Sequence, residues 1–155
     1  MNIILLGVYL HYYILLQKPE YVHLETTILA QWMLESNYGK SELSSRYFNY
    51  SGLKYRHEVQ GYMKIIYTDS VGEVDQYFAL PTPTGFCKLY FSFLERKRYH
   101  GIGATLGSKF AFLSHLQSRG FSTDKDYIKK IERVMRSTKF KELVRDINRR
   151  ILWNN

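Results

Sequence analysis

The sequence has little cysteine and no metal-ligand pattern, and each shortage excludes a class of chemistry. Cys87 is the single cysteine of the 155 residues, so no internal disulfide can form. No base partner for a thiol nucleophile can be assigned, and we expect Cys87 to be a small buried residue. The histidines do not recur at metal-ligand spacing, so we predict no metal and no cofactor. They are His11, His23, His57, His100 and His115.

Long apolar runs are also missing. The apolar stretch over residues 2–17 is shorter than the roughly 20 residues that a membrane-spanning helix needs, and it contains His11. It lacks a basic beginning and a small-residue cleavage site, which makes it a poor signal peptide. We therefore predict a first core helix within residues 1–18 and no stable membrane span. An uncleaved export signal or an interfacial anchor stays open as an alternative.

Acidic residues are outnumbered, 14 against 22 lysines and arginines, which gives a formal charge of +8. Residues 125–150 hold ten of the basic residues and four of the acidic ones. A basic protein is attracted to polyanions, among them nucleic acid, anionic lipid and the anionic polymers of a bacterial wall. We favour a solvated helix face or attraction to wall polymers over nucleic-acid binding, whose sign would be affinity for DNA that falls steeply with salt.

The size and patterning indicate one globular domain, because 45% of the side chains are hydrophobic and no repeat or linker interrupts them. Apolar residues at helical spacing predict helices over about 24–37, 41–47, 86–94, 106–116, 127–135 and 138–155. The last of these is basic and amphipathic. Two β-branched and aromatic runs, 63–68 and 73–78, flank a turn and predict a β-hairpin. The predicted fold class is α+β, mostly α.

Two local details belong to this prediction. Leu106, Phe110, Leu113 and Leu116 share one face of the helix predicted over 106–116. Thr123, followed three residues later by Asp126, resembles a capping box that would open the next helix.

Glu35 lies near the end of the nearly apolar helix predicted over residues 24–37. Burial disfavours the charged form of a carboxyl group, and proteins use such a protonated carboxyl as a proton donor near neutral pH. Glu35 is therefore the first candidate for a catalytic acid. The alternative is a glutamate that faces solvent at a helix end, and helical periodicity alone favours that alternative.

Four segments, taken together and in order, resemble the signature of bacterial glucosaminidases, which are glycoside hydrolase family 73. This lysozyme-like group includes flagellar, autolysin and phage peptidoglycan hydrolases. The matching segments cover about residues 24–135, whereas the helix from about residue 138 lies outside them. The first contains Leu34-Glu35-Ser36 and Gly39-Lys40-Ser41, and the others are Tyr47–Lys54, Arg96–Tyr99 and Gly120–Ile131. The sequence departs from the family at Ser51, where an aromatic residue is usual, and in the hairpin.

The resemblance implies a single lysozyme-like helical domain with one small β-hairpin lobe. It also implies a glycoside hydrolase, an endo-β-N-acetylglucosaminidase that cleaves the β-1,4 bond between N-acetylglucosamine and N-acetylmuramic acid in peptidoglycan. Glu35 would be the general acid that protonates the leaving oxygen. The glycan strands would be the main partner, and anionic wall polymers could bind the basic C-terminal helices.

A second group must activate water or stabilise the sugar cation. The family resemblance favours Asp69, which follows Thr68, with Glu73 second and Asp75 and Glu58 behind them. Turns favour aspartate for backbone reasons alone, and the N-acetyl group of the substrate could replace a protein nucleophile. The identity of this second group stays open.

Further site candidates follow from the resemblance and from the chemistry of tyrosine. Tyr99 matches the tyrosine of the family's Arg-Tyr turn and would bond the N-acetyl group or the water; the alternative is a ring packed under the cleft. Tyrosine rings can stack on sugar faces. The candidates for substrate contact are Gln31, Tyr38, Asn49, Tyr50 and Tyr77, and Asn49 could instead brace the catalytic loop.

Two other functions stay open at this point. A lytic transglycosylase uses a glutamate in a similar Glu-Ser context and forms an anhydro product without water. A non-catalytic module that binds wall glycan inside a phage particle would explain the poorly matched hairpin. The expected setting is the bacterial cell wall or periplasm, for a phage-encoded lysin, a virion-associated hydrolase or a secreted bacterial enzyme.

Overall fold

The computed structural model describes residues 3–153 and confirms an α+β domain dominated by helix. Within these residues the strands form one antiparallel pair, β1 (Met63–Thr68) and β2 (Val74–Ala79). The α-helices are α1 (Ile3–Gln17), α2 (Glu25–Glu35), α3 (Glu42–Tyr47), α4 (Gly85–Leu94), α5 (Lys109–Ser118), α6 (Tyr127–Arg136) and α7 (Thr138–Trp153). Short 3₁₀ helices are η1 (Pro19–Leu24), η2 (Lys97–Tyr99) and η3 (Ile102–Thr105).

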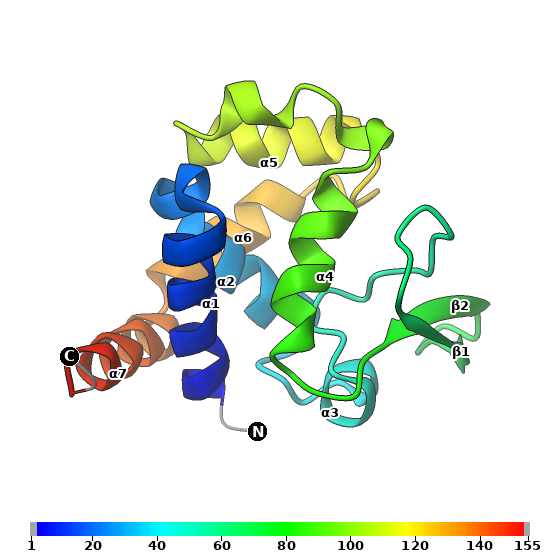
Figure 1. Ribbon diagram of the computed structural model, residues 1–155, viewed down its shortest axis with the longest axis horizontal. Coiled ribbons are helices and arrows are strands. Elements are labelled where there is room, and N and C mark those ends of the chain that lie inside the picture. Colours follow the sequence, from blue (N-terminus) through cyan, green and yellow to red (C-terminus); the bar gives the residue numbers. More distant parts are fainter. Residues whose placement is uncertain (1–2, 154–155) are drawn as a thin grey trace.

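Helix α2 is the centre of the helical part and packs against α1 and α6 (Figure 1). Its residues from Thr27 to Met33 are all buried, as expected for a helix that is apolar on all sides. The indole of Trp32 lies edge-on to the rings of Phe86 and Tyr90 in α4, at centroid distances of 4.9 and 5.2 Å. This packing fixes the direction in which α2 presents its last residue, Glu35.

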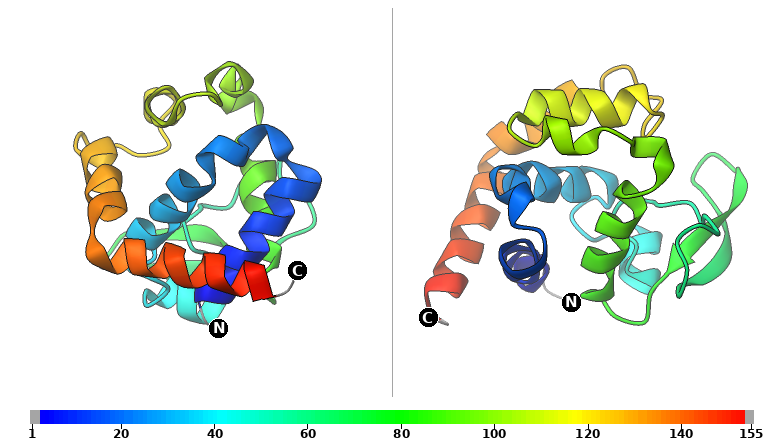
Figure 2. Two further views of the ribbon diagram at one scale, coloured as in Figure 1. Left: turned by 90° about the vertical axis from the view of Figure 1, so that its left-hand side faces the viewer. Right: turned by 45° about the horizontal axis from the view of Figure 1, so that its top comes forward.

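Helix α1 is a core helix, since Leu6, Leu10 and Ile14 are buried. Helix α7 lies across its outer side (Figure 2). The two helices approach closely at Gly7, where an added Cβ would lie 2.2 Å from the Cδ1 atom of Ile147. Among the described residues, no helix combines the length and apolarity required to cross a bilayer.

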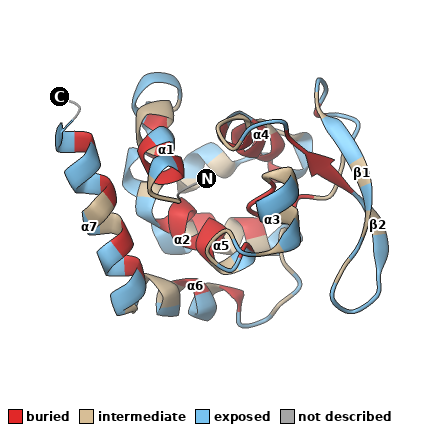
Figure 3. Cartoon of the chain, turned by 90° about the horizontal axis from the view of Figure 1, so that it is seen from below, coloured by how far each residue is buried: buried red, intermediate tan, exposed pale blue. Residues whose placement is uncertain are grey.

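The hairpin forms a lobe at one side of the helical part, and most of its surface is exposed (Figure 3). Its strands pair from Met63 opposite Ala79 to Thr68 opposite Val74. Only the end of β2 is buried, and the backbone N–H of Phe78 donates to the carbonyl of Leu53 at 3.1 Å. The lobe is therefore attached to the rest of the domain mainly through β2.

Two local predictions are wrong. The Ser108 side chain caps α5 by accepting the N–H of Ala111, so α5 begins at Lys109 and excludes Leu106. Phe110 is 65% exposed, and Phe112 instead shares the buried face of α5 with Leu113 and Leu116. The capping box before α6 is also absent.

At the start of α6, Asp126 makes no side-chain cap. Instead the Asp124 Oδ1 atom accepts the N–H of Asp126 at 2.9 Å. The predicted role of Thr123 and Asp126 is thus replaced by a local turn that Asp124 closes.

Candidate active site

Ser36 ends α2 directly after Glu35 and holds the chain there. Its backbone N–H and its hydroxyl both donate to the carbonyl of Trp32, at 3.0 and 2.6 Å. The same hydroxyl accepts the N–H of Gly39 at 2.8 Å, and the Ser36 carbonyl accepts the N–H of Ser41 at 2.9 Å. These bonds satisfy the groups that a helix end leaves open and fix the position of Glu35.

The turn after Ser36 uses left-handed backbone. Asn37, Tyr38 and Gly39 have φ angles of 49°, 56° and 77°. A Cβ at residue 39 would lie 3.1 Å from the side chain of Ile3, so glycine suits this position for both angle and space. Ser41 then caps α3 by accepting the N–H of Ser44. The spacing of serine, glycine and serine in this segment therefore builds the support behind Glu35.

A cavity of about 550 Å³ lies between the end of α2, the hairpin and η2; we call it the groove. Four aromatic side chains face it, as do charged side chains of both signs. Glu35, Asp69, Glu73, Tyr77 and Tyr99, all predicted as site residues, are among its lining residues. The fold thus brings together residues that are up to 64 positions apart in the sequence.

Glu35 is exposed toward the groove, yet protein surrounds the rest of the carboxyl group. Burial raises its pKa from 4.5 to about 7, and the nearby Asp124 carboxylate raises it further, while Lys130 opposes the change. Exposure and a raised pKa are compatible here because a recessed group meets water only at the groove opening. Glu35 is therefore partly protonated near neutral pH and still accessible to a ligand.

The hairpin carboxylates differ in what engages them. Asp69 Oδ1 accepts the backbone N–H groups of Val71 and Glu73, at 3.0 and 2.9 Å, which is the turn role of aspartate. Asp75 Oδ2 lies 3.0 Å from Lys54 Nζ and does not line the groove. Only Asp69 and Glu73 of the hairpin acids face the cavity that contains Glu35.

Tyr99 lines the groove although it is only 2% exposed. Burial raises the pKa of its phenol, and the Arg96 guanidinium opposes this change. The guanidinium also lies over the ring of Phe93, 4.0 Å from its centroid, and its Nε–H donates to the Phe93 carbonyl at 3.1 Å. Arg96 is thus a nearly buried cation that orders this wall of the groove.

Four predicted contact residues lie elsewhere. Gln31 is fully buried and bonds the hydroxyls of Tyr90 and Tyr127, so it supports α2 and does not reach a groove ligand. Tyr50 is buried against Phe86. Neither residue presents surface to the groove, because each packs on the core side of its own segment.

Asn49 and Tyr38 also lie away from the groove. Asn49 is buried; its Nδ2 atom donates to the carbonyls of Leu53 and Phe78, and its Oδ1 atom accepts the Leu53 N–H. It braces the loop that meets β2, which is the alternative given for it above. The ring of Tyr38 is covered by Lys139, whose Nζ atom lies 3.7 Å from the centroid.

Sequence reasoning missed the basic side chains of the groove. Lys54, Arg56, Arg96 and Arg98 line it together with the three carboxyl groups. Only Tyr99 is predicted from the segment Arg96–Tyr99, although three basic residues at consecutive positions already indicate a charged wall. Phe121, Ser122 and Thr123 also line the groove. Within residues 3–153, no group of three or more His, Cys, Asp or Glu side chains could hold a metal ion.

Comparison with known proteins places the chain in a family. The fold is similar to the crystal structure of a peptidoglycan hydrolase from Sphingomonas sp. A1, with a TM-score of 0.66 and 19% identity over 88% of this chain and 94% of that one. It is also similar to the glycoside hydrolase domain of Salmonella typhimurium FlgJ, with a TM-score of 0.55 and 22% identity over 84% and 85% of the two chains. No curated protein sequence matches the chain.

A family model, glucosaminidase, described as mannosyl-glycoprotein endo-beta-N-acetylglucosaminidase, matches residues 11–140. The protein therefore belongs to the glucosaminidase family of glycoside hydrolases, as its sequence motifs predict.

Proposed function

We propose that this glycoside hydrolase acts on peptidoglycan. It cleaves the β-1,4 bond between N-acetylglucosamine and N-acetylmuramic acid that leaves N-acetylglucosamine at the new reducing end. Family membership supports the reaction class. The likeness of the fold to a peptidoglycan hydrolase and to the FlgJ domain supports the substrate. The groove supports a sugar polymer as ligand, because its lining carries both aromatic and charged side chains.

Glu35 is the general acid of the proposal, and one observation carries it. A carboxyl group with a pKa of about 7 lies in the wall of the groove, and it is the proton donor that glycoside cleavage needs. Glu35 gives its proton to the bridging oxygen as the bond from that oxygen to the anomeric carbon breaks. The hydroxyl of a water then joins the anomeric carbon, and the remaining proton restores the acid.

The second group is Asp69 or Glu73, or the N-acetyl oxygen of the substrate. Both side chains line the groove with Glu35. Asp69 leads because its Oδ1 atom is held by two backbone N–H groups, which leaves Oδ2 for water or sugar. Tyr99 would bond the N-acetyl group from the opposite wall, and Tyr77 would contact a sugar ring.

Mass spectrometry of fragments released from purified sacculi tests this function. We expect wild-type protein to release fragments that end in reducing N-acetylglucosamine. Glu35→Gln should lower the rate by about 10²- to 10⁴-fold, the range for removal of a general acid, with an unchanged circular dichroism spectrum. Anhydro products would instead identify a lytic transglycosylase. Binding to sacculi with no released ends would identify a glycan-binding module, and clearing at the normal rate by Glu35→Gln would exclude Glu35 as the acid.

The basic residues of α6 and α7 supply the proposed attraction to anionic wall polymers. Several lysines and arginines of these helices are exposed on the side away from the core. Such a face strengthens attachment to a polyanionic wall without touching the groove. The enzyme would then act at the bacterial wall, where both a phage lysin and a secreted bacterial hydrolase meet their substrate. Sacculi stripped of anionic polymers should bind the protein less tightly at low salt.

A further inference from the structure

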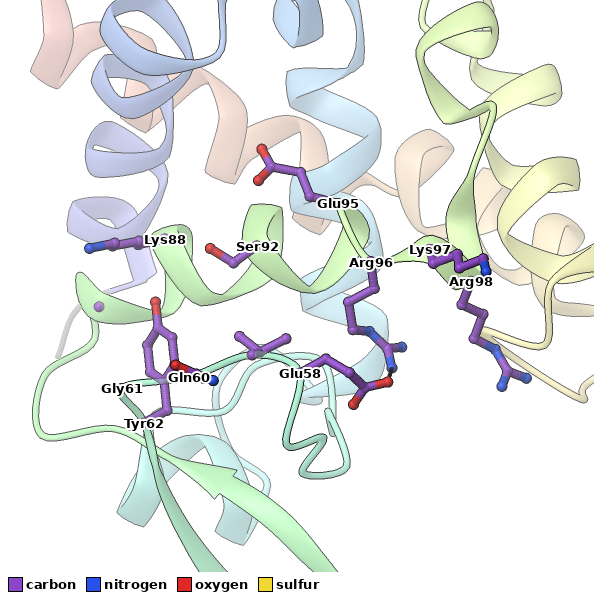
Figure 4. Close-up of a pocket in the computed structure, with 12 residues that line it drawn as sticks. Glu58, Gln60, Gly61, Tyr62, Lys88, Ser92, Glu95, Arg96, Lys97 and Arg98 are labelled. Atoms are coloured by element: carbon purple, nitrogen blue, oxygen red, sulfur yellow. Dashed lines mark ion pairs between the residues drawn. The ribbon is translucent and has the colours of Figure 1, made fainter.

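A second cavity, of about 690 Å³, lies beside the groove, between α4 and residues 58–62; we call it the α4 trough. Figure 4 shows α4 along one side of it, with Lys88 toward one end and Lys97 and Arg98 toward the other. The helical stretch from Lys88 to Leu94 alone extends about 9 Å, at 1.5 Å per residue. The trough is thus elongated enough for an extended chain of about three residues, at about 3.3 Å each.

The charges of the trough leave a positive surplus. Its two acids are engaged by cations: Glu95 pairs with Lys18, and Glu58 Oε1 lies 3.9 Å from Arg96 Nη1. Lys88 and Lys97 have no ion-pair partner among the described residues. These lysines can therefore attract carboxylates at both ends of the trough.

The trough also offers neutral hydrogen-bonding groups in its middle. The Tyr62 hydroxyl is buried and makes no hydrogen bond of good geometry among the described residues. Ser92 lies across from it on α4; burial raises the pKa of the Tyr62 phenol, and a polar contact with the Ser92 side chain opposes this change.

The trough and the groove meet at η2, because Arg96 and Arg98 line both cavities. Their linings nevertheless differ. Four aromatic rings face the groove, and they are those of Tyr77, Phe93, Tyr99 and Phe121. In the trough the lining residues include one ring, that of Tyr62, among six charged residues. Sugars favour aromatic faces, whereas a peptide with free carboxylates favours lysine and arginine side chains.

We propose that the α4 trough binds an acidic peptide attached to the glycan that occupies the groove. This inference rests on the proposed function, since peptidoglycan carries short carboxylate-bearing peptides on every second sugar. A peptide leaving the sugar near η2 would pass Arg98 and Lys97, run along α4 past Ser92 and Tyr62, and end near Lys88. The enzyme would thereby distinguish peptide-bearing glycan from bare glycan.

The test compares two substrates and three proteins. The substrates are a peptidoglycan and the same peptidoglycan after an amidase has removed its peptides. The proteins are wild type, the double variant Lys88→Glu/Lys97→Glu, and Lys109→Glu, which reverses an exposed lysine at the start of α5 that lines neither cavity. We expect the double variant to lose about tenfold in kcat/KM on the intact substrate, through KM, and to match wild type on the stripped one. Lys109→Glu should match wild type on both substrates.

A second measurement does not depend on catalysis. The peptides released by the amidase are titrated into each protein, and binding is followed by the NMR shifts of residues 58–62. Wild type should bind them, and the double variant should not. Equal losses on both substrates, or peptide binding that survives the two charge reversals, would overturn the proposal. Failure of wild type to cleave either substrate would count against the proposed function, while peptide binding would still report on the trough.

Discussion

The groove has two walls that are built in different ways. The helical wall ends in Glu35, whose position is fixed by the bonds of Ser36 and by a helix that is buried from Thr27 to Met33. The hairpin wall carries Asp69 and Glu73 on a lobe whose outer side chains, such as Ile66, are largely exposed. A buried scaffold can hold a carboxyl group at one place and change its pKa. An exposed lobe packs less protein around its acids, and Asp69 is held there by the backbone of its own turn.

Among substitutions that test the difference between the two walls, those at Asp69 are expected to change activity most. Asp69→Asn keeps an Oδ1 acceptor for the N–H groups of Val71 and Glu73 but removes the charge. If Asp69 is the second catalytic group, kcat falls about a hundredfold while the unfolding temperature stays unchanged. Asp69→Ala removes both functions, and steady-state rates of reducing-end release measure each variant.

The matched control for Asp69 is Glu73→Gln, a change of equal charge in the same turn. It should cost less activity than Asp69→Asn. A near-normal rate for Asp69→Asn combined with a slow Asp69→Ala would assign Asp69 a turn role only. Normal rates for all hairpin variants would favour the N-acetyl group of the substrate as the second group.

The contrast between the walls also explains how far the sequence could be interpreted. The helical elements follow from apolar periodicity, and Glu35 follows from the segment that contains Ser36 and Gly39. The hairpin follows from its β-branched runs, but its sequence matches the family poorly. A second catalytic group could not be selected from its acids, because a turn and an active site both favour aspartate.

Side-chain direction was the part that the sequence could not supply. Gln31 and Glu35 share one helical stripe, yet Gln31 is fully buried and Glu35 opens to the groove. The difference arises because α4 and α6 cover α2 up to its last turn, through Tyr90 and Tyr127. The basic lining of the groove could not be predicted for a similar reason. Arg96 lies between α4 and η2, and so short a segment has no periodic pattern that indicates where its side chains point.

A second prediction concerns the support of the helical wall. Gln31→Leu removes the buried partner of two tyrosine hydroxyls, those of Tyr90 and Tyr127. Leaving them unpaired should lower the free energy of unfolding by about 2–3 kcal/mol, as measured by urea denaturation. Replacing Tyr127 with phenylalanine in the same protein should recover part of the loss, because one unpaired hydroxyl is then gone. An unchanged stability of Gln31→Leu would mean that the network is not important for α2.

A third prediction uses the pKa of Glu35, which rises from 4.5 to about 7 on folding. Between these values the folded protein binds a proton that the unfolded chain releases, so the free energy of unfolding falls as the pH rises through this window. Glu35→Gln removes this dependence. The variant should therefore gain in unfolding temperature relative to wild type between about pH 4 and about pH 8.

The activity of wild type should follow the same group, and kcat/KM should fall above about pH 7 as Glu35 loses its proton. If wild type and Glu35→Gln differed in unfolding temperature by the same amount at every pH, this result would contradict the burial of the Glu35 carboxyl group.

The smallest effect is expected on the outer face of the hairpin. Ile66 is 77% exposed and lies on β1, opposite Gln76. Ile66→Thr keeps a β-branched side chain, so the free energy of unfolding should change by no more than about 0.5 kcal/mol, and activity should be unchanged. Phe78→Ala, on the fully buried side of the same lobe, should cost about 3–5 kcal/mol. If Ile66→Thr instead slowed cleavage without altering stability, the outer face of the hairpin would itself contact the glycan, and the hairpin wall would extend beyond the groove.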